Sequence, residues 1–182
     1  MPLIKVLNRK GKYHDADARE VVINYILNPA KAISGFMGCT SNVNPLDIAG
    51  SMESFAQLHK KTKGIQLRHT VISFTPDEVD DPEIVNEIAR EVASFVGQNY
   101  QPVFSVHEDR EHLHFHLVCN SVGYNGKKYL GKKKDYYDFI KVVKNILHCY
   151  AIYRVITVSS LSDADIQGNE KNHVDDEYDF FE

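Results

Sequence analysis

Histidines are concentrated in one short stretch of the sequence. Four of the nine histidines, His107, His112, His114 and His116, fall within the string VHEDREHLHFHLVCN. Side chains two residues apart on a strand point to the same face, so His112, His114 and His116 are expected to lie on an open face while apolar residues pack on the other. His107 closes the preceding strand of a predicted hairpin, which brings a further imidazole beside His114 and His116.

Three neutral imidazoles that converge from two adjacent strands can bind a divalent cation and leave coordination positions vacant for a ligand. The predicted ligands are His107, His114 and His116. His112 is an additional site residue, because the pattern does not decide which three of the four imidazoles bind. Asp109, two residues after His107, is placed to orient one imidazole through a hydrogen bond.

The same histidines fit two alternatives that the pattern leaves open. Alternating histidines can simply face solvent on a half-exposed strand. A structural zinc site is the second alternative, but such sites usually recruit cysteine and close with four protein ligands. The cysteines lack CxxC spacing, so we expect reduced packing residues at Cys39, Cys119 and Cys149.

The elements that position these residues follow from apolar periodicity, which switches between two and about 3.6 residues along the chain. Strands are predicted at 2–8, 65–74, 102–107, 112–119 and 154–158, and helices at 15–27, 45–63, 81–96 and 135–153. Asn44 is the predicted N-cap of the helix at 45–63. Hairpin strands mixed with helices predict an α+β two-layer sandwich, a central antiparallel sheet with helices on one face.

The composition is that of an ordinary globular domain, 43% hydrophobic and 25% charged. The net charge of −4 is unevenly divided, because residues 161–182 hold eight acidic residues and one lysine, whereas residues 1–160 hold 20 basic and 17 acidic residues. We predict one folded domain over 1–160 and an acidic tail or linker over 161–182, with a charged terminal helix as the alternative for the tail. The sequence has no apolar run of membrane-spanning length and no secretory signal pattern, so a cytosolic protein is expected.

Three strings resemble the motifs of one enzyme family. HxD followed by HLHFH and LVCNSVGYNGKKY is similar to the metal-binding motif of plasmid and transposon mobilisation relaxases, the P clade of conjugative DNA-nicking enzymes in the histidine-hydrophobe-histidine endonuclease superfamily. INYILNPAK resembles their first motif, and RHTVISF resembles their second. The resemblance runs over residues 1 to about 150 and departs at His112, where some relatives have another residue.

The resemblance implies a relaxase fold in which Tyr25 is the nucleophile and Ser73 contacts DNA near the cleaved phosphate. Relaxases cleave one strand at a transfer origin and leave a 5′-phosphotyrosine and a free 3′-hydroxyl. This attack needs a divalent cation, expected to be Mg²⁺ or Mn²⁺, and an acceptor for the phenolic proton. Asp109 is the candidate acceptor, either directly or by polarising His107.

Other residues are assigned by position. His69 shares strand parity with Ser73, so it either approaches the site or is an ordinary buried histidine of the sheet. Tyr136 and Tyr137 imitate the paired tyrosines of another relaxase clade, but that pair belongs near the N-terminus and here it follows the histidines. A lysine-rich loop is expected to neutralise the DNA backbone with Lys127, Lys128, Lys132, Lys133 and Lys134.

The predicted function is therefore that of a mobilisation relaxase domain, active in horizontal gene transfer in the bacterial cytoplasm. The expected partners are single-stranded DNA at a transfer origin, an accessory DNA-binding protein and a type IV secretion coupling protein, without membrane insertion. Two alternatives are kept. One is a non-catalytic single-stranded DNA-binding module of the same fold, and the other is a histidine-metal phosphodiesterase that forms no covalent adduct.

Overall fold

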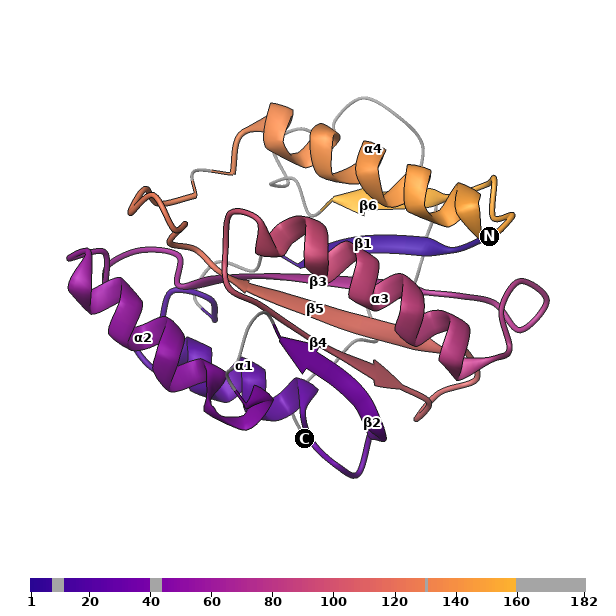
Figure 1. Cartoon of the computed structure of the whole chain (residues 1–182), viewed down its shortest axis with the longest axis horizontal. Helices are drawn as coiled ribbons and strands as arrows, with labels where there is room; N and C mark the ends of the chain where they lie inside the picture. The colour runs from indigo at the N-terminus through magenta and orange to yellow at the C-terminus, as the bar shows by residue number, and fades with distance from the viewer. Residues whose placement is uncertain (8–11, 40–43, 130, 160–182) are drawn as a thin grey trace.

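A computed structural model describes residues 1–7, 12–39, 44–129 and 131–159, and it contains a six-stranded sheet of order β2-β4-β5-β3-β1-β6 (Figure 1). The strands are β1 (Leu3–Leu7), β2 (Ala32–Cys39), β3 (Leu67–Ser73), β4 (Pro102–His107), β5 (His114–Asn120) and β6 (Ile156–Ser159). The helices are α1 (Ala18–Ile26), η1 (Pro45–Asp47, a 3-10 turn), α2 (Ile48–Leu58), α3 (Pro82–Gly97) and α4 (Lys133–Cys149). The predicted acidic tail at 161–182 lies outside the described residues.

Neighbouring strands in the sheet are antiparallel with one exception. β5 lies between β4 and β3 and is antiparallel to both, so the predicted β4–β5 hairpin is confirmed. β6 runs parallel to β1 at one edge. The α+β class, with a central antiparallel sheet and flanking helices, is confirmed, and β6 makes the sheet mixed.

Helices cover both faces of the sheet, where the sequence predicted helices on one face. α3 and α4 pack on the face that carries Phe115 and Leu117 (Figure 1). α1 and α2 pack on the opposite face, around Leu67, Val103 and Val118. Periodicity identifies the apolar stripe of a helix, but it does not say which sheet face the stripe covers. The face that carries the histidines is therefore partly covered and is not an open surface.

The strand β2 was not predicted. Its sequence AISGFMGC does not alternate between apolar and polar residues. The strand is also irregular, because Gly35 takes a positive φ of 84° and the pairing with β4 shifts register between Ala32 and Met37. At Gly38, a Cβ atom would lie 2.8 Å from the ring of Phe104, so a larger residue would push this strand away from β4. The strand depends on backbone conformations and close contacts that a periodic pattern does not show.

Side-chain caps explain two helix starts. Asn44 Oδ1 accepts a hydrogen bond from the backbone N–H of Leu46 at 3.0 Å, as expected of an N-cap, although the first turn is η1. Asp81 Oδ1 accepts from the N–H of Glu83 at 2.8 Å at the start of α3. The helix predicted at 45–63 is shorter than expected and ends at Leu58.

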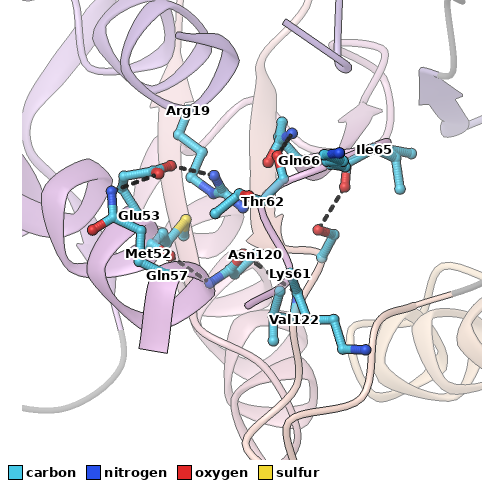
Figure 2. Close-up of polar contacts among 12 residues, drawn as sticks. Arg19, Met52, Glu53, Gln57, Lys61, Thr62, Ile65, Gln66, Asn120 and Val122 are labelled. Atoms are coloured by element: carbon cyan, nitrogen blue, oxygen red, sulfur yellow. Dashed lines mark hydrogen bonds and ion pairs between the residues drawn. The ribbon is translucent and has the colours of Figure 1, made fainter. Parts of the chain in front are cut away.

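A polar network fixes α1 and α2 to the end of the sheet opposite the β4–β5 turn (Figure 2). Asn120 is fully buried, and its Nδ2 donates to the carbonyl of Met52 at 3.1 Å and to Gln101 Oε1 at 2.9 Å. Arg19 on α1 forms an ion pair with Glu53 on α2. Because buried polar groups are costly without partners, these bonds hold the helices in one position on the histidine face.

Asn120→Ala is expected to lower the free energy of unfolding by about 1–3 kcal/mol, because the Met52 carbonyl would be left without this donor in a buried position. Urea unfolding followed by circular dichroism measures the change. Lys141→Ala, at an exposed position of α4, is the control and should change the same free energy by less than about 0.5 kcal/mol. Equal stability of Asn120→Ala and the parent chain would contradict a stabilising role for the network.

Candidate active site

Three histidines converge on one face of the β4–β5 hairpin. His107 ends β4 and lies opposite His114 in the antiparallel ladder, and His116 lies two residues further along β5. The ring centroids of His107 and His116 are 4.5 Å apart, and the other two pairs are each 5.3 Å apart. One potential ligand atom from each ring lies within 4.8 Å of the other two. The hairpin register alone therefore gathers the three predicted metal ligands.

Two of these rings are held by backbone carbonyls. His107 Nε2 donates to the carbonyl of Ile26 at 2.7 Å, and His114 Nδ1 donates to the carbonyl of His112 at 3.0 Å. A carbonyl oxygen only accepts, so each neutral ring carries its proton on that nitrogen and its lone pair on the other. His107 Nδ1 is buried and meets no hydrogen-bond partner within the part of the chain that the structure describes. Such a nitrogen fits a metal ligand whose second nitrogen is already bonded.

The third ring is held by another histidine. His69 Nε2, on β3, lies 2.8 Å from His116 Nδ1, so the structure brings His69 into direct contact with the cluster. Burial lowers the pKa of His69 to about 3, and nearby Lys12 and His107 add to this effect. His69 is therefore neutral at physiological pH and can act as a hydrogen-bond partner with a free choice of tautomer.

Burial keeps the cluster itself neutral. His107 is fully buried and His116 is 2% exposed, which differs from the expected open face because α1 lies against it. Desolvation lowers the pKa of His107 to about 4, lowers that of His116 well below its ordinary value and also lowers that of His114. Neutral imidazole is the form that binds a cation, so this environment favours metal binding near neutral pH.

The lowered pKa of His107 predicts how the stability of the metal-free protein depends on pH. In the unfolded chain His107 binds its proton near pH ~6.5, whereas in the folded protein it does so near pH 4. The unfolded state therefore binds more protons between these values. The stabilising contribution of neutral His107 is expected to be complete above pH ~6.5 and to be lost as the pH falls toward 4.

Urea unfolding of the chelator-treated protein, over a range from neutral to about pH 4, checks this expectation. His107→Gln is the matched variant, since it removes the titrating ring and keeps a polar side chain. Its free energy of unfolding should vary less with pH than that of the parent chain. Identical slopes for the two proteins would contradict the shifted pKa.

The last turn of α1 places Tyr25 against the histidines. Tyr25 is half-buried, and its ring meets the His116 ring edge-on with the centroids 5.8 Å apart. The adjacent carbonyl of Ile26 accepts the hydrogen bond from His107, which ties the end of α1 to β4. α1 stops here because the chain turns at Asn28, whose side chain accepts from a backbone N–H two residues on.

Two charged side chains border the same site. Asp109 Oδ1 lies 3.6 Å from His114 Nε2 and 4.0 Å from His107 Nδ1. Asp109 Oδ2 lies 3.8 Å from the Nζ of Lys31, and that Nζ lies 4.8 Å from the centre of the Tyr25 ring. Lys31 was not singled out from the sequence, although it ends the string INYILNPAK. The turn after α1 brings its charge back over the tyrosine, which no local pattern indicates.

Two further predicted residues have clear positions. Ser73 is half-buried and lies directly across from His114 in the β3–β5 ladder, on the histidine face. His112 precedes β5 and is exposed, and the group at its position that contacts the cluster is its backbone carbonyl. The described histidines whose ligand atoms gather are His107, His114 and His116, without the side chain of His112.

The lysine-rich loop leaves the other end of β5, about 20 Å along the strand from His114. Lys128 donates to the carbonyls of Lys61 and Lys63, and Lys134 forms an ion pair with Asp138. The structure therefore does not bring these lysines to the histidine cluster. Tyr136 and Tyr137 lie on α4, which packs on the opposite sheet face from the histidines.

A protein-family model matches most of this chain. The nuclease domain of MobA/VirD2-like relaxases matches residues 25–152, a range that begins at Tyr25 and includes the whole histidine cluster. The chain belongs to this relaxase family. The resemblance inferred from the three motifs is confirmed.

Curated relatives of this relaxase domain are longer proteins. A protein named rlx from Staphylococcus aureus is 36% identical over 117 residues, which are 62% of this chain and 34% of the relative. A second Staphylococcus aureus protein named rlx is 35% identical over 123 residues, 65% of this chain and 35% of the relative. The group II intron-interrupted relaxase LtrB of Lactococcus lactis subsp. cremoris is 38% identical over 72 residues, 38% of this chain and 13% of the relative. The match thus covers about a third or less of these relatives.

None of the helices in the described ranges is both long and apolar enough to cross a lipid bilayer.

Proposed function

We propose that this relaxase domain cleaves and rejoins one strand of DNA at a transfer origin, with Tyr25 as the nucleophile. The observation that carries the proposal is the position of the Tyr25 ring, edge-on to His116 at 5.8 Å and under the Lys31 ammonium. A nucleophile must lie beside the groups that neutralise the phosphate it attacks. Tyr136 and Tyr137, on the other side of the sheet, do not meet this condition.

In the proposed reaction the phenolic oxygen of Tyr25 attacks phosphorus. The bond between this oxygen and phosphorus forms while the bond from phosphorus to O3′ breaks. The phenolic proton passes to an acceptor, and the departing O3′ takes up a proton to become a 3′-hydroxyl. The phosphotyrosine keeps a phosphodiester bond, so attack by a 3′-hydroxyl reverses the step and rejoins the strand.

Three side chains around Tyr25 have roles in this proposal. Asp109 accepts the phenolic proton; it does not orient His107 or His114 by a hydrogen bond, because its carboxylate faces the ring nitrogens that carry the lone pairs. The Lys31 ammonium favours the negative charge that develops on the phenolic oxygen. Ser73, which lies across from His114, would donate to a phosphate oxygen near the cleaved bond.

His107, His114 and His116 would hold the divalent cation, for which we propose Mg²⁺ or Mn²⁺. When bound, the cation withdraws charge from the non-bridging oxygens of the phosphate. Three protein ligands leave coordination positions for those oxygens and for water. The fit rests on the three ligand atoms within 4.8 Å and on the buried Nδ1 of His107.

The proposal also includes further DNA contacts and two protein partners. The lysines of the loop after β5 would contact DNA phosphates away from the cleaved bond, since they lie at the far end of that strand. An accessory DNA-binding protein and the coupling protein of a type IV secretion system would act with the domain in the bacterial cytoplasm. The family membership supports these assignments.

The test is a covalent adduct. The protein is incubated with Mn²⁺ and single-stranded oligonucleotides that span candidate origins, and denaturing gels reveal a shifted protein band. We expect an adduct and, after addition of a second oligonucleotide, transfer of the cut strand to its 3′-hydroxyl. Binding without cleavage would identify a DNA-binding module, and cleavage of a chromogenic diester without an adduct would identify a phosphodiesterase.

A further inference from the structure

Two hydrogen bonds in series connect the histidine cluster to Tyr13. Tyr13 Oη lies 3.2 Å from His69 Nδ1, and His69 Nε2 lies 2.8 Å from His116 Nδ1. The three residues are 4%, 2% and 2% exposed, respectively. They come from the segment before α1, from β3 and from β5, and 56 and 47 positions of sequence separate the bonded pairs. Buried polar contacts over such separations are fixed by the tertiary structure.

The contact of His116 differs in kind from those of the other two predicted ligands. His107 and His114 donate to backbone carbonyls, which accept only and therefore fix the ring tautomer. His116 faces an imidazole, which can either donate or accept. Because Nδ1 of His116 is engaged by His69, ligation of a cation falls to Nε2, and this nitrogen must then carry no proton.

One of the two proton arrangements in this series is compatible with ligation. In the first, His116 Nδ1–H donates to His69 Nε2, and His69 Nδ1–H donates to Tyr13 Oη. In the second, Tyr13 donates to His69 and His69 donates to His116, which moves the His116 proton to Nε2. A hydroxyl oxygen accepts as well as donates, so Tyr13 permits the first arrangement.

We propose that Tyr13 and His69 are positioning residues for the metal centre, which supply the acceptor needed by the Nδ1-protonated form of His116 and so present its Nε2 to the cation. This inference rests on the metal centre of the proposed function. Partners of this kind orient metal-bound histidines and typically change metal affinity about 10- to 100-fold when they are replaced.

Three variants test the proposal. In a glutamine the amide can take the place of His69 Nε2, and in an asparagine it can take the place of Nδ1. His69→Gln therefore keeps the acceptor toward His116, whereas His69→Asn keeps the contact toward Tyr13. Tyr13→Phe removes the hydroxyl and keeps the ring. Thermal unfolding without metal shows that each variant folds.

Calorimetric titration with Mn²⁺ is the first measurement. We expect His69→Asn to weaken Mn²⁺ binding about 10- to 100-fold, His69→Gln to restore most of the affinity, and Tyr13→Phe to weaken binding by less than His69→Asn. Equal affinities for all variants and the parent would overturn the proposal, as would equal losses for His69→Gln and His69→Asn, which indicate packing alone.

The second measurement separates this proposal from the metal centre. Nitrogen NMR of the imidazole rings in the metal-free protein reports the tautomer of His116. We expect the Nδ1-protonated form in the parent chain and in His69→Gln, and a mixture in His69→Asn. An Nε2-protonated His116 in the parent would overturn the positioning role of Tyr13 and His69, whether or not the protein binds Mn²⁺. Absence of Mn²⁺ binding by a parent chain with the expected tautomer would instead overturn the metal centre.

Discussion

Tyr25→Phe is expected to abolish both the DNA adduct and strand cleavage, by roughly 10⁴-fold or more, while DNA binding and stability persist. The substitution removes the oxygen that would form the bond to phosphorus. It keeps the ring, which packs edge-on against His116 at 5.8 Å. The adduct is measured on denaturing gels and the free energy of unfolding by urea titration.

Tyr137→Phe is the matched control, because it removes a hydroxyl from an exposed tyrosine on α4. Its adduct yield should equal that of the parent chain. Peptide mapping of the parent adduct should locate the nucleotide on the fragment that contains INYILNPAK. Nucleotide on the Tyr136–Tyr137 fragment would refute the assignment of Tyr25, and nicking by Tyr25→Phe with free ends would indicate attack by water.

His114→Ala is expected to weaken Mn²⁺ binding by more than about 100-fold and to eliminate cleavage with it. Removal of one of three nitrogen ligands leaves a pair that cannot hold a labile divalent cation against water. DNA binding should persist, because the phosphate contacts proposed for the loop lysines do not need the cation. Calorimetry gives the metal affinity, and circular dichroism confirms that the variant is folded.

His112→Ala tests which imidazoles bind. His112 is exposed, and its contact with His114 uses the backbone carbonyl, which alanine retains. We therefore expect unchanged Mn²⁺ affinity for His112→Ala. A loss comparable to that of His114→Ala would mean that the side chain of His112 is a ligand and that the set His107, His114 and His116 is incorrect.

The hairpin that carries the histidines could be predicted because the residues that determine it are close together in the sequence. Alternation over HLHFH assigns the side chains to two faces, and the polar segment between the strands makes them antiparallel neighbours. The strand predicted at 102–107 has the observed bounds. The strand predicted at 112–119 begins two residues later in the structure, at His114. His112 therefore lies before β5 and its side chain is not part of the histidine cluster.

The parts that could not be predicted depend on contacts between distant segments. β2 contains a register shift opposite β4, and the packing of α1 on the histidine face joins elements whose order in sequence does not reveal it. Lys31 reaches Tyr25 only through the turn that ends α1. Parity placed His69 on the correct sheet face, but its bond to His116 depends on the pairing of β3 with β5.

The bond from His107 Nε2 to the carbonyl of Ile26 has a thermodynamic consequence for the relaxase domain. A cation on Nδ1 requires the proton on Nε2, and that proton holds the helix end that carries Tyr25. The cation and the DNA strand of the proposed function would therefore be coupled ligands of one site. Linkage is reciprocal, so the factor by which the cation raises affinity for the strand is also the factor by which the strand raises affinity for the cation. A scissile strand bound in this way would therefore strengthen the hold of the domain on its metal.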